Sequence, residues 1–385
     1  MKERTRIGLY YIWNKSWIGG VYYAQNLLKA LNFLADEDKP YIDVYCLNDD
    51  SYEDLKKNTN YPYLEKNLIR LSLLKKIYRE ILYRTRGDVA GASVDLFKIQ
   101  EYDQMLYPYS FGSEADKIVC WKQDFQEKYY PELFSETEIM KRDRTIRTLS
   151  KRGVPIVFSS YDSQNAFKKF YPNSNTKTFV VHFAVSHANF ANANIDDIIN
   201  KYGIKGDYLL CANQFWKHKN HLYLFKAYNE ALQKGLKIQL VCTGRMADYR
   251  NPGYIEEIKK YISDNHLTSN VVLCGLVETE ELYCLMQNAY AIVQPSLFEG
   301  WNTTVEDCKA LNKFIFLSDI PVHREQIGEN VCFFNPHDCR DLSNKLLEVQ
   351  PLTVTLDYSN NLKEFGQDFL RVINYVTERQ SKNSQ

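Results

Sequence analysis

The stretch from Ser296 to Gln326, SLFEGWNTTVEDCKALNKFIFLSDIPVHREQ, constrains the fold of this chain more than any other. An apolar run of strand length, residues 289–294, precedes it. Apolar residues then recur at helical spacing over 303–311, and a second buried-strand run covers 314–317. A strand, a loop, a helix and a strand in this order predict part of an α/β unit with a parallel sheet.

Polar and small residues gather where this strand meets the helix: Glu299, Gly300, Trp301, Asn302, Thr303, Thr304 and Glu306. A helix start offers unpaired N–H groups and the positive end of the helix dipole, so the place suits a phosphate. One interpretation puts a diphosphate on the N–H groups of Asn302 to Thr304, a sugar at Glu299 and ribose hydroxyls at Glu306. The other is a capping box, in which Thr303 caps the helix and the Glu306 side chain accepts a hydrogen bond from the backbone N–H of Thr303.

Composition narrows the class of protein. A chain of 385 residues corresponds to two or three domains, and lysine plus arginine balances aspartate plus glutamate at 48 each, so no global charge indicates nucleic acid. No apolar run is long enough to span a membrane, and the charged first residues do not resemble a signal peptide. The nine cysteines form no C-x-x-C pair, which favours reduced core residues in a cytoplasmic protein.

A glycine pair, Gly19-Gly20, follows the first expected strand, residues 6–12, and directly precedes a helix with an apolar face. A glycine loop at a helix start suits an anion, although glycines serve tight strand-to-helix turns about as often. The next strand is expected at 42–47, which gives a β-α-β beginning.

Residues 56–86 are rich in lysine and arginine and poor in acids, and apolar residues from Leu73 to Tyr83 fit one helical stripe. A basic amphipathic helix suits peripheral contact with an anionic membrane surface. A solvated basic face over an ordinary core stripe is the alternative.

The loop Asp124-Phe125-Gln126 follows a strand expected at 118–121. Doubly wound sheets bind ligands beyond the carboxyl ends of their parallel strands, which makes Asp124 a candidate site residue. A loop aspartate that caps a turn is the alternative.

A second domain is expected after a linker at 186–196. It begins with a strand at 208–212 and a helix that starts near Lys219 or Asn220. Lys217 and Lys219 stand at the carboxyl edge of that strand, where they would hold phosphates as point charges or simply be solvated. Arg245 follows the next strand, where it would touch a nucleotide or only the surface.

The run LFEGW, followed by VED and SDIPVHREQ, resembles the donor-binding segment of family-4 retaining glycosyltransferases, which belong to glycosyl transferases group 1. The segments CW, DFQ and PELFS, between Cys120 and Ser135, resemble the N-terminal domain of the same branch. The family pattern has two glutamates with seven residues between them. Six residues separate Glu299 from Glu306 in this chain.

The resemblance implies an α/β fold of the GT-B type. This fold has two Rossmann-like doubly wound domains facing across a cleft, and a C-terminal helix that crosses back to the first domain. We therefore expect an acceptor-side domain at 1–190, a donor-binding domain at 197–355, and a crossover helix and tail at 356–385.

The resemblance also implies roles for the candidate residues. Glu299 and Asp124 are the catalytic candidates. Lys219 matches the family's lysine at the pyrophosphate, and Gln214 takes the place of its arginine, so Lys217 is the candidate for the second charge. The donor-binding candidates are Gly19, Gly20, Asn213, Gln214, Lys217, Lys219, Arg245, Val277, Gly300, Trp301, Asn302, Thr303, Thr304 and Glu306. We expect no metal and no cofactor, because the nucleotide-sugar is a substrate and basic groups can stabilise the leaving diphosphate.

The predicted function is a metal-independent, retaining hexosyltransferase. It would move a sugar from a nucleotide-sugar donor to a glycan or lipid-linked acceptor, in bacterial surface polysaccharide synthesis, with no nucleic-acid partner. We expect it in the cytoplasm, at the inner face of the cell membrane where residues 56–86 make that contact. Two other classes stay open, a GT-B-fold sugar-nucleotide epimerase and a non-catalytic nucleotide-sugar-binding subunit. Glu299 and Lys219 favour a working transfer site over both.

Overall fold

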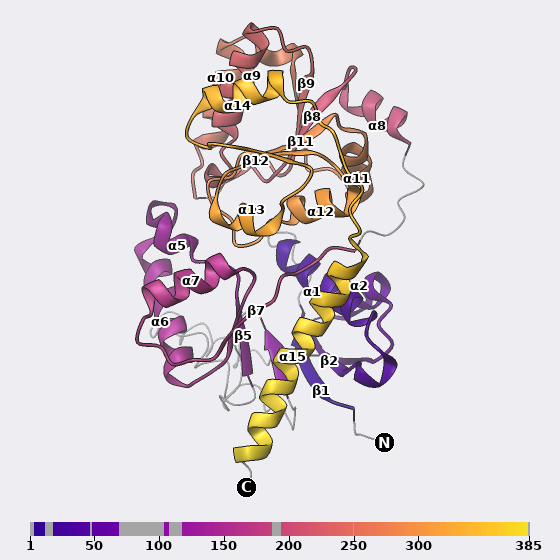
Figure 1. Cartoon of the computed structure of the whole chain (residues 1–385), viewed down its shortest axis with the longest axis vertical. Coiled ribbons are helices and arrows are strands. Elements are labelled where there is room, and N and C mark those ends of the chain that lie inside the picture. Colours follow the sequence, from indigo (N-terminus) through magenta and orange to yellow (C-terminus); the bar gives the residue numbers. More distant parts are fainter. Residues whose placement is uncertain are drawn as a thin grey trace. The chain divides into compact units, whose positions relative to one another are not determined.

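The computed structural model of the chain describes residues 4–11, 18–46, 48–68, 104–107, 118–186, 194–248 and 250–383. Contacts divide the chain into two compact units. Unit 1 comprises Met1–Ser186 and Ser359–Gln385, and unit 2 comprises His187–Tyr358. Each unit is built from a parallel sheet with helices packed around it (Figure 1), which confirms the predicted α/β class.

The sheet of unit 1 is wholly parallel, in the order β3-β2-β1-β4-β5-β6-β7. This order reverses direction between β1 and β4, as in a doubly wound fold. Its strands are β1 (Arg6–Tyr10), β2 (Tyr41–Cys46), β3 (Leu64–Leu68), β4 (Gln104–Tyr107), β5 (Ile118–Lys122), β6 (Ile156–Phe158) and β7 (Thr178–Val180). Its helices are α1 (Ile18–Leu31), α2 (Asp49–Thr59), α5 (Gln126–Tyr129), α6 (Glu136–Lys151), α7 (Tyr161–Phe170) and α15 (Ser359–Asn383).

The C-terminal helix α15 belongs to unit 1 although it follows unit 2 in the chain, as the GT-B resemblance predicted. It packs against α1, where the Phe365 ring lies 5.9 Å from that of Tyr23. Gly366 allows the close approach, because a Cβ there would lie 2.7 Å from the carbonyl oxygen of Ala30.

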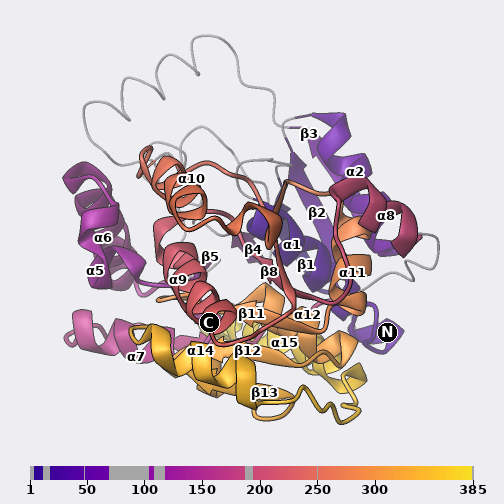
Figure 2. The same ribbon diagram turned by 90° about the horizontal axis from the view of Figure 1, so that it is seen from above.

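Unit 2 has a second parallel sheet, in the order β10-β9-β8-β11-β12-β13. Its strands are β8 (Tyr208–Ala212), β9 (Gln239–Thr243), β10 (Val271–Gly275), β11 (Ala291–Gln294), β12 (Ile315–Ser318) and β13 (Val331–Phe334). Its helices are α8 (Ile195–Tyr202), α9 (His221–Gln233), α10 (Tyr254–Asp264), α11 (Thr279–Asn288), α12 (Thr303–Leu311), α13 (Pro321–Gln326) and α14 (Cys339–Glu348), and Figure 2 shows them around the sheet from a second side.

The sheet of unit 2 is buried on both faces, so its strands are apolar without alternation. Within β8, Leu209 and Cys211 belong to one hydrophobic cluster, and Tyr208 and Leu210 belong to the cluster on the opposite face. The two clusters fix the sheet between two layers of helices, and the strand ends carry the loops described below.

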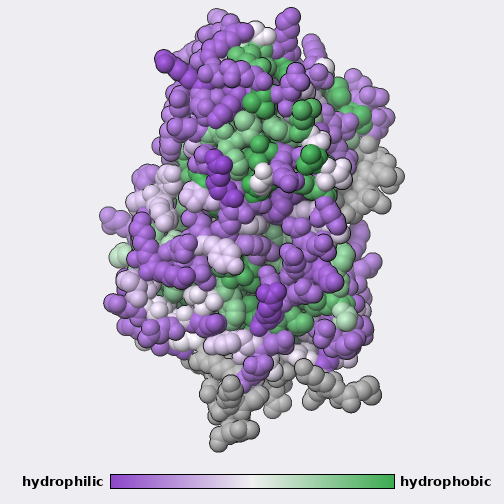
Figure 3. All heavy atoms as spheres, in the orientation of Figure 1, coloured by the Kyte–Doolittle hydropathy of each residue, from purple (hydrophilic) through white to green (hydrophobic). Residues whose placement is uncertain are grey.

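Hydrophilic side chains make up most of the face seen in Figure 3, with smaller hydrophobic areas between them. Among the helices formed by the described residues, none combines the length and hydropathy needed to cross a membrane. Most of the basic stretch 56–86 lies outside the described residues. Within its described part, Lys66 Nζ lies 2.7 Å from Asp49 Oδ1.

Candidate active site

The strand order of unit 2 indicates where a ligand is expected to bind. Strands β8 and β11 are neighbours at the centre of the sheet, and the chain winds outward in opposite directions from them. Ligands of doubly wound sheets bind beyond the carboxyl ends of the strands at such a switch point. The loops after β8 and β11 meet there, since Leu297 N donates to His218 O at 2.9 Å.

An ion pair joins these two loops. Lys219 Nζ lies 2.6 Å from Glu299 Oε1, and the two side chains are 15% and 10% exposed. The buried amide of Gln294, at the end of β11, also donates to Glu299 Oε1, from 3.3 Å. The predicted phosphate-binding lysine and the predicted catalytic glutamate are thus in direct contact.

Lys219 lies in a short 3₁₀ turn, η5 (Lys217–Lys219), and α9 begins at His221 with Asn220 as its cap residue, close to the start expected near Lys219 or Asn220. Asn220 separates the turn from the helix with a φ of 62°, a left-handed conformation that asparagine tolerates better than most residues. The backbone N–H of Lys217 donates to the buried Asp248 Oδ2 at 3.0 Å, while the Lys217 side chain is exposed. The loop after β9 therefore fixes the turn that carries the lysines.

A second basic residue, Arg250, lies against this turn. Its Nη2 is 3.5 Å from His218 Nδ1, and its guanidinium carbon lies 5.1 Å from the centroid of the Trp216 ring. Burial lowers the pKa of His218 well below its usual value, and the charges of Lys219 and Arg250 lower it further. Sequence reasoning did not single out Asp248 or Arg250. The sequence feature that could have identified these two residues is the run of charged residues directly after β9, at the carboxyl end of that strand.

Two further donor-binding candidates support the loop after β8. Asn213 Nδ2 donates to the buried Gln294 Oε1, and Gln214 Oε1 accepts from the backbone N–H of Arg245 at 3.1 Å. The side chain of Arg245 is exposed at the end of β9. These contacts hold the carboxyl ends of β8, β9 and β11 together.

Gly244 makes this arrangement of strand ends possible. Its φ is 126°, and a Cβ there would lie 2.1 Å from the carbonyl oxygen of Asn213. Any residue with a side chain would therefore push the loop after β8 out of place.

The remaining donor-binding candidates of unit 2 lie on two other segments. Val277 follows β10, and Gly300 and Trp301 are buried in the loop before α12. Thr304 Oγ1 donates to the carbonyl of Ala212 at 3.2 Å, which ties the first turn of α12 to the end of β8.

The cap of α12 is Asn302 and not Thr303. Its Oδ1 accepts from Val305 N at 3.3 Å, and its own N–H donates to Gln326 Oε1 at 3.1 Å. A helix start leaves four N–H groups without an intrahelical acceptor. Among the described residues, those of Thr303 and Thr304 remain as donors for a ligand, because the N–H groups of Asn302 and Val305 are already used.

Glu306 is a buried residue of α12, 1% exposed. Its Oε1 accepts from Lys309 Nζ and Gln326 Nε2, both at 2.9 Å, and its Oε2 accepts from the Tyr358 hydroxyl at 2.6 Å. The capping-box interpretation with Thr303 is therefore wrong. A ribose would have to join or replace one of these three donors, and the ribose role of Glu306 stays a prediction.

Asp307, the next residue, was not among the predicted site residues. Burial raises the pKa of its carboxyl group well above the usual value, and the neighbouring Glu306 raises it further. Seven residues separate it from Glu299, which is the spacing of the family pattern. That spacing was the signal that could have found it.

In unit 1, the predicted site residues lie in the loop after β5 and in the first turn of α1. Asp124 Oδ1 accepts from Gln126 N at 2.9 Å, the turn-capping contact of the alternative interpretation. Gly19 and Gly20 lie in the first turn of α1, which begins at Ile18 and not after the glycines as expected. The N–H groups of a first turn have no intrahelical acceptor, so this position still suits an anion.

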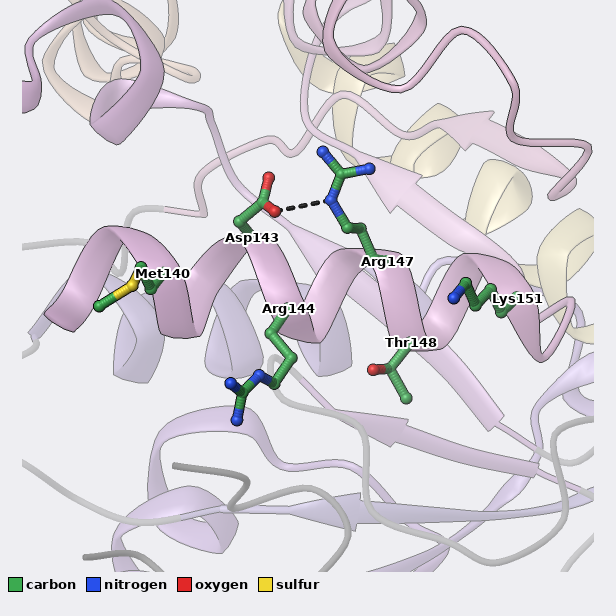
Figure 4. Close-up of a pocket in the computed structure, with 6 residues that line it drawn as sticks. All are labelled: Met140, Asp143, Arg144, Arg147, Thr148 and Lys151. Atoms are coloured by element: carbon green, nitrogen blue, oxygen red, sulfur yellow. Dashed lines mark hydrogen bonds and ion pairs between the residues drawn. The ribbon is translucent and has the colours of Figure 1, made fainter. Parts of the chain in front are cut away.

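A shallow pocket of about 380 Å³ lies on α6 and contains none of the predicted site residues. It is lined by Met140, Asp143, Arg144, Arg147, Thr148 and Lys151, and Figure 4 shows Arg147 pointing toward Asp143. Burial opposes ionisation of Asp143, but hydrogen bonds from Lys128, Arg147 and Tyr171 outweigh it and lower the pKa to about 2. Asp143 is therefore a structural anion that holds this helix.

Solved structures show which fold this is. The chain superposes on HepE of Anabaena, solved with UDP and glucose, with a TM-score of 0.62 at 14% identity over 99% of each chain. It superposes on sucrose-phosphate synthase of Thermosynechococcus elongatus with a TM-score of 0.60 at 14% identity, over 99% of this chain and 98% of the other. The fold of the chain is GT-B.

Sequence comparison finds one matching family and a similar protein of known name. Residues 194–367 match the family Glycosyl transferases group 1. The chain is also similar to the O-antigen chain mannosyltransferase RfbU of Salmonella typhimurium, with 25% identity over 238 residues. That alignment covers 62% of this chain and 62% of RfbU, which is less than two thirds of that relative.

Proposed function

We propose that this protein is a retaining glycosyltransferase, which moves a hexose from a nucleotide-sugar donor to a glycan or lipid-linked acceptor. The observation that carries the proposal is the contact between Lys219 and Glu299 at the carboxyl ends of β8 and β11, inside the segment that matches the family. The fold and the family match support the same activity. The name of RfbU makes a mannose donor the first to test, and bacterial surface polysaccharide the expected product class.

The roles of the residues follow from their charge and position. Lys219 would leave Glu299 and bind the donor diphosphate, together with the N–H groups of Thr303 and Thr304. When the bond from the anomeric carbon to the diphosphate breaks, its electron pair stays on the diphosphate. Fixed donors that stabilise this charge lower the barrier. Glu299, released from its lysine, would face the positive charge that develops on the sugar, while Glu306 would hold the ribose.

In unit 1, we propose that Asp124 contributes to the sugar or acceptor pocket, and that Gly19 and Gly20 bind the donor diphosphate. Their support is the position of each at the carboxyl end of a parallel strand or in a first helical turn. For Asp124 this requires that the contact with Gln126 N leave its second oxygen to the substrate.

The transfer is proposed to need no metal ion, because Lys219 and the α12 N–H groups supply the positive charge that a magnesium ion would otherwise bring. Turnover should then survive EDTA. Loss of activity on chelation that magnesium or manganese restores would contradict this part of the proposal.

The test begins with a thermal-shift screen against sugar nucleotides that differ in base and sugar, since a ligand that binds only the folded state raises Tm. Nucleoside diphosphate release is then measured with and without acceptor. A transferase releases it in proportion to added acceptor, and an epimerase releases it without one. A non-catalytic subunit binds the nucleotide and releases nothing, and either of these outcomes would overturn the proposal.

A lipid-linked acceptor would place the protein at a membrane surface, and we propose residues 56–86 as the contact. Each well-placed basic residue near an anionic surface adds about 1 kcal/mol. Sedimentation with anionic vesicles that fails at high salt would support the contact. Equal sedimentation with neutral vesicles would leave the solvated-face interpretation.

A further inference from the structure

The short helix α13 reaches across to the start of α12. The side-chain amide of Gln326 bonds both backbone groups of Asn302. Its Oε1 accepts from the N–H at 3.1 Å, and its Nε2 donates to the carbonyl at 2.8 Å. Both residues are buried. Gln326 thus pairs with Asn302 as a neighbouring strand would, and fixes the backbone of the residue that caps α12.

His323, one turn earlier on α13, fixes the side chain of the same asparagine. His323 Nδ1 lies 2.9 Å from the carbonyl oxygen of Ser318, so this nitrogen carries the proton and donates. Its Nε2 then accepts from Asn302 Nδ2 at 3.3 Å. The amide of Asn302 is thereby oriented, with its oxygen directed at Val305 N.

The tautomer that this geometry requires is neutral, and the surroundings support it. Burial lowers the pKa of His323 to about 4, while Glu299 and the Ser318 carbonyl act in the opposite direction and Lys219 adds to the lowering. His323 is therefore uncharged at neutral pH. It can accept the hydrogen bond that orients Asn302.

We propose that Gln326 and His323 are positioning residues of the transferase, which hold Asn302 so that the N–H groups of Thr303 and Thr304 point at the donor diphosphate. The inference rests on the proposed function for the identity of the ligand. The hydrogen bonds from Gln326 and His323 to Asn302, which we call the clamp, are a property of the free protein. Without it, the cap and the loop from Glu299 to Asn302 would lose their fixed orientation, and the two donors would no longer be preorganised.

Gln326→Met tests the clamp without changing the volume much, since methionine fills the same space and bonds neither group of Asn302. The matched control is Arg324→Gln on the same helix, whose guanidinium pairs with Asp319 on the exposed side. Hydrogen exchange of the ligand-free protein should become roughly tenfold or more faster in a peptide covering 299–306 for Gln326→Met, if each lost hydrogen bond has an ordinary strength. The rest of unit 2, and the control, should stay unchanged.

Ligand binding supplies the second measurement. The probes are UDP, GDP and ADP, and the matching nucleosides without phosphate. Gln326→Met should weaken binding of the nucleoside diphosphate by roughly 10- to 100-fold, the range expected when hydrogen bonds to a charged group are lost. Gln326→Met also removes the hydrogen bond from Gln326 Nε2 to Glu306 Oε1, the proposed ribose ligand, so nucleoside binding is compared in His323→Gln, which keeps that bond and should bind the nucleoside within about twofold of wild type. A variant that is merely less stable would lose both together.

Unchanged exchange and unchanged diphosphate affinity in folded Gln326→Met would overturn the inference. If Gln326→Met does not fold, His323→Gln decides by the same two measurements, because it changes the contacts to the Asn302 side chain and to Ser318 and leaves the bonds of Gln326 in place. A wild-type protein that binds none of the nucleoside diphosphates would contradict the proposed function. Hydrogen exchange in the peptide covering 299–306 would still test whether Gln326 and His323 fix Asn302.

Discussion

Glu299 and Glu306 flank the start of the same helix, yet their surroundings differ. Glu299 stands in a loop, 10% exposed, with Lys219 as its one cationic partner among the described residues. Glu306 is buried on α12 and accepts from a lysine, an amide and a tyrosine hydroxyl. A carboxylate with one cationic partner, in a loop at the carboxyl ends of the strands, can exchange that partner for a substrate. One that is surrounded by donors is held in place.

The difference also separates what each acid can do during a reaction. In the proposed mechanism, Glu299 acts on charge that appears only in the transition state, because its contact with Lys219 would end when the lysine turns to the phosphate. Any contact of Glu306 with a ribose would be about equal in the ground state and the transition state. The comparison therefore predicts a kcat effect for one acid and a KM effect for the other.

The largest effect is expected from Glu299→Gln. The substitution keeps the shape and removes the charge proposed to face the sugar, so kcat should fall by roughly 100-fold or more, as for other fixed charges that stabilise a transition state. The donor KM should change little, since Lys219 is then free to bind the diphosphate. Steady-state release of nucleoside diphosphate at saturating acceptor measures both, with the exposed Glu256→Gln on α10 as control.

Lys219→Ala should come next. It removes the cation proposed to bind the diphosphate and leaves Glu299 without its cationic partner, so donor binding should weaken by roughly 2 to 4 kcal/mol. Titration with the nucleoside diphosphate measures the loss. Lys226→Ala, on the exposed face of α9, removes the same charge away from the crevice and should bind normally. Wild-type affinity in Lys219→Ala would contradict its assignment.

Glu306→Gln tests the KM effect that the comparison predicts for the second acid. It should raise the donor KM with a much smaller fall in kcat. The loss of hydrogen bonds to a charged group should also lower the free energy of unfolding by about 1 to 3 kcal/mol, measured in urea. If this variant instead abolishes kcat while Glu299→Gln only weakens binding, the two roles are exchanged. An unchanged KM would direct the search for the ribose ligand to Asp307.

Local patterns predict the elements of this site well. The apolar spacing of 303–311 predicted a helix, and α12 covers Thr303–Leu311. The strands on either side were also predicted, and the position of Lys219 and Glu299 at two strand ends followed from parallel order. These features depend on residues close in sequence. There, the spacing of apolar residues determines the type of element, and the chain direction determines which strand end carries each loop.

Contacts between distant residues were not predictable in this way. The cap of α12 is Asn302 because Gln326, far along the chain, fixes its backbone, whereas sequence alone favoured Thr303 and a capping box. The partners of Glu306 were unpredictable for the same reason. Tyr358 and Gln326 are distant from it in the sequence and contact it only in the folded unit. The close packing at Gly244 likewise depends on the carbonyl of Asn213, which no local pattern identifies.

The smallest effect is expected from Tyr358→Phe, which distinguishes a ribose ligand from a purely structural acid. The substitution removes only the hydroxyl that donates to Glu306 Oε2. It should lower the free energy of unfolding by about 1 kcal/mol, the usual contribution of one hydrogen bond. If Glu306 holds the ribose, Tyr358 competes with the substrate for that oxygen, so the donor KM should stay the same or fall. The matched control is Tyr228→Phe, which loses a buried hydroxyl bonded to Ile238 O at 2.7 Å in the same unit. A donor KM that rises in Tyr358→Phe but not in this control would show that Glu306 acts only by anchoring α12. Glu299 would then be the reacting acid of the pair, and Glu306 a structural one.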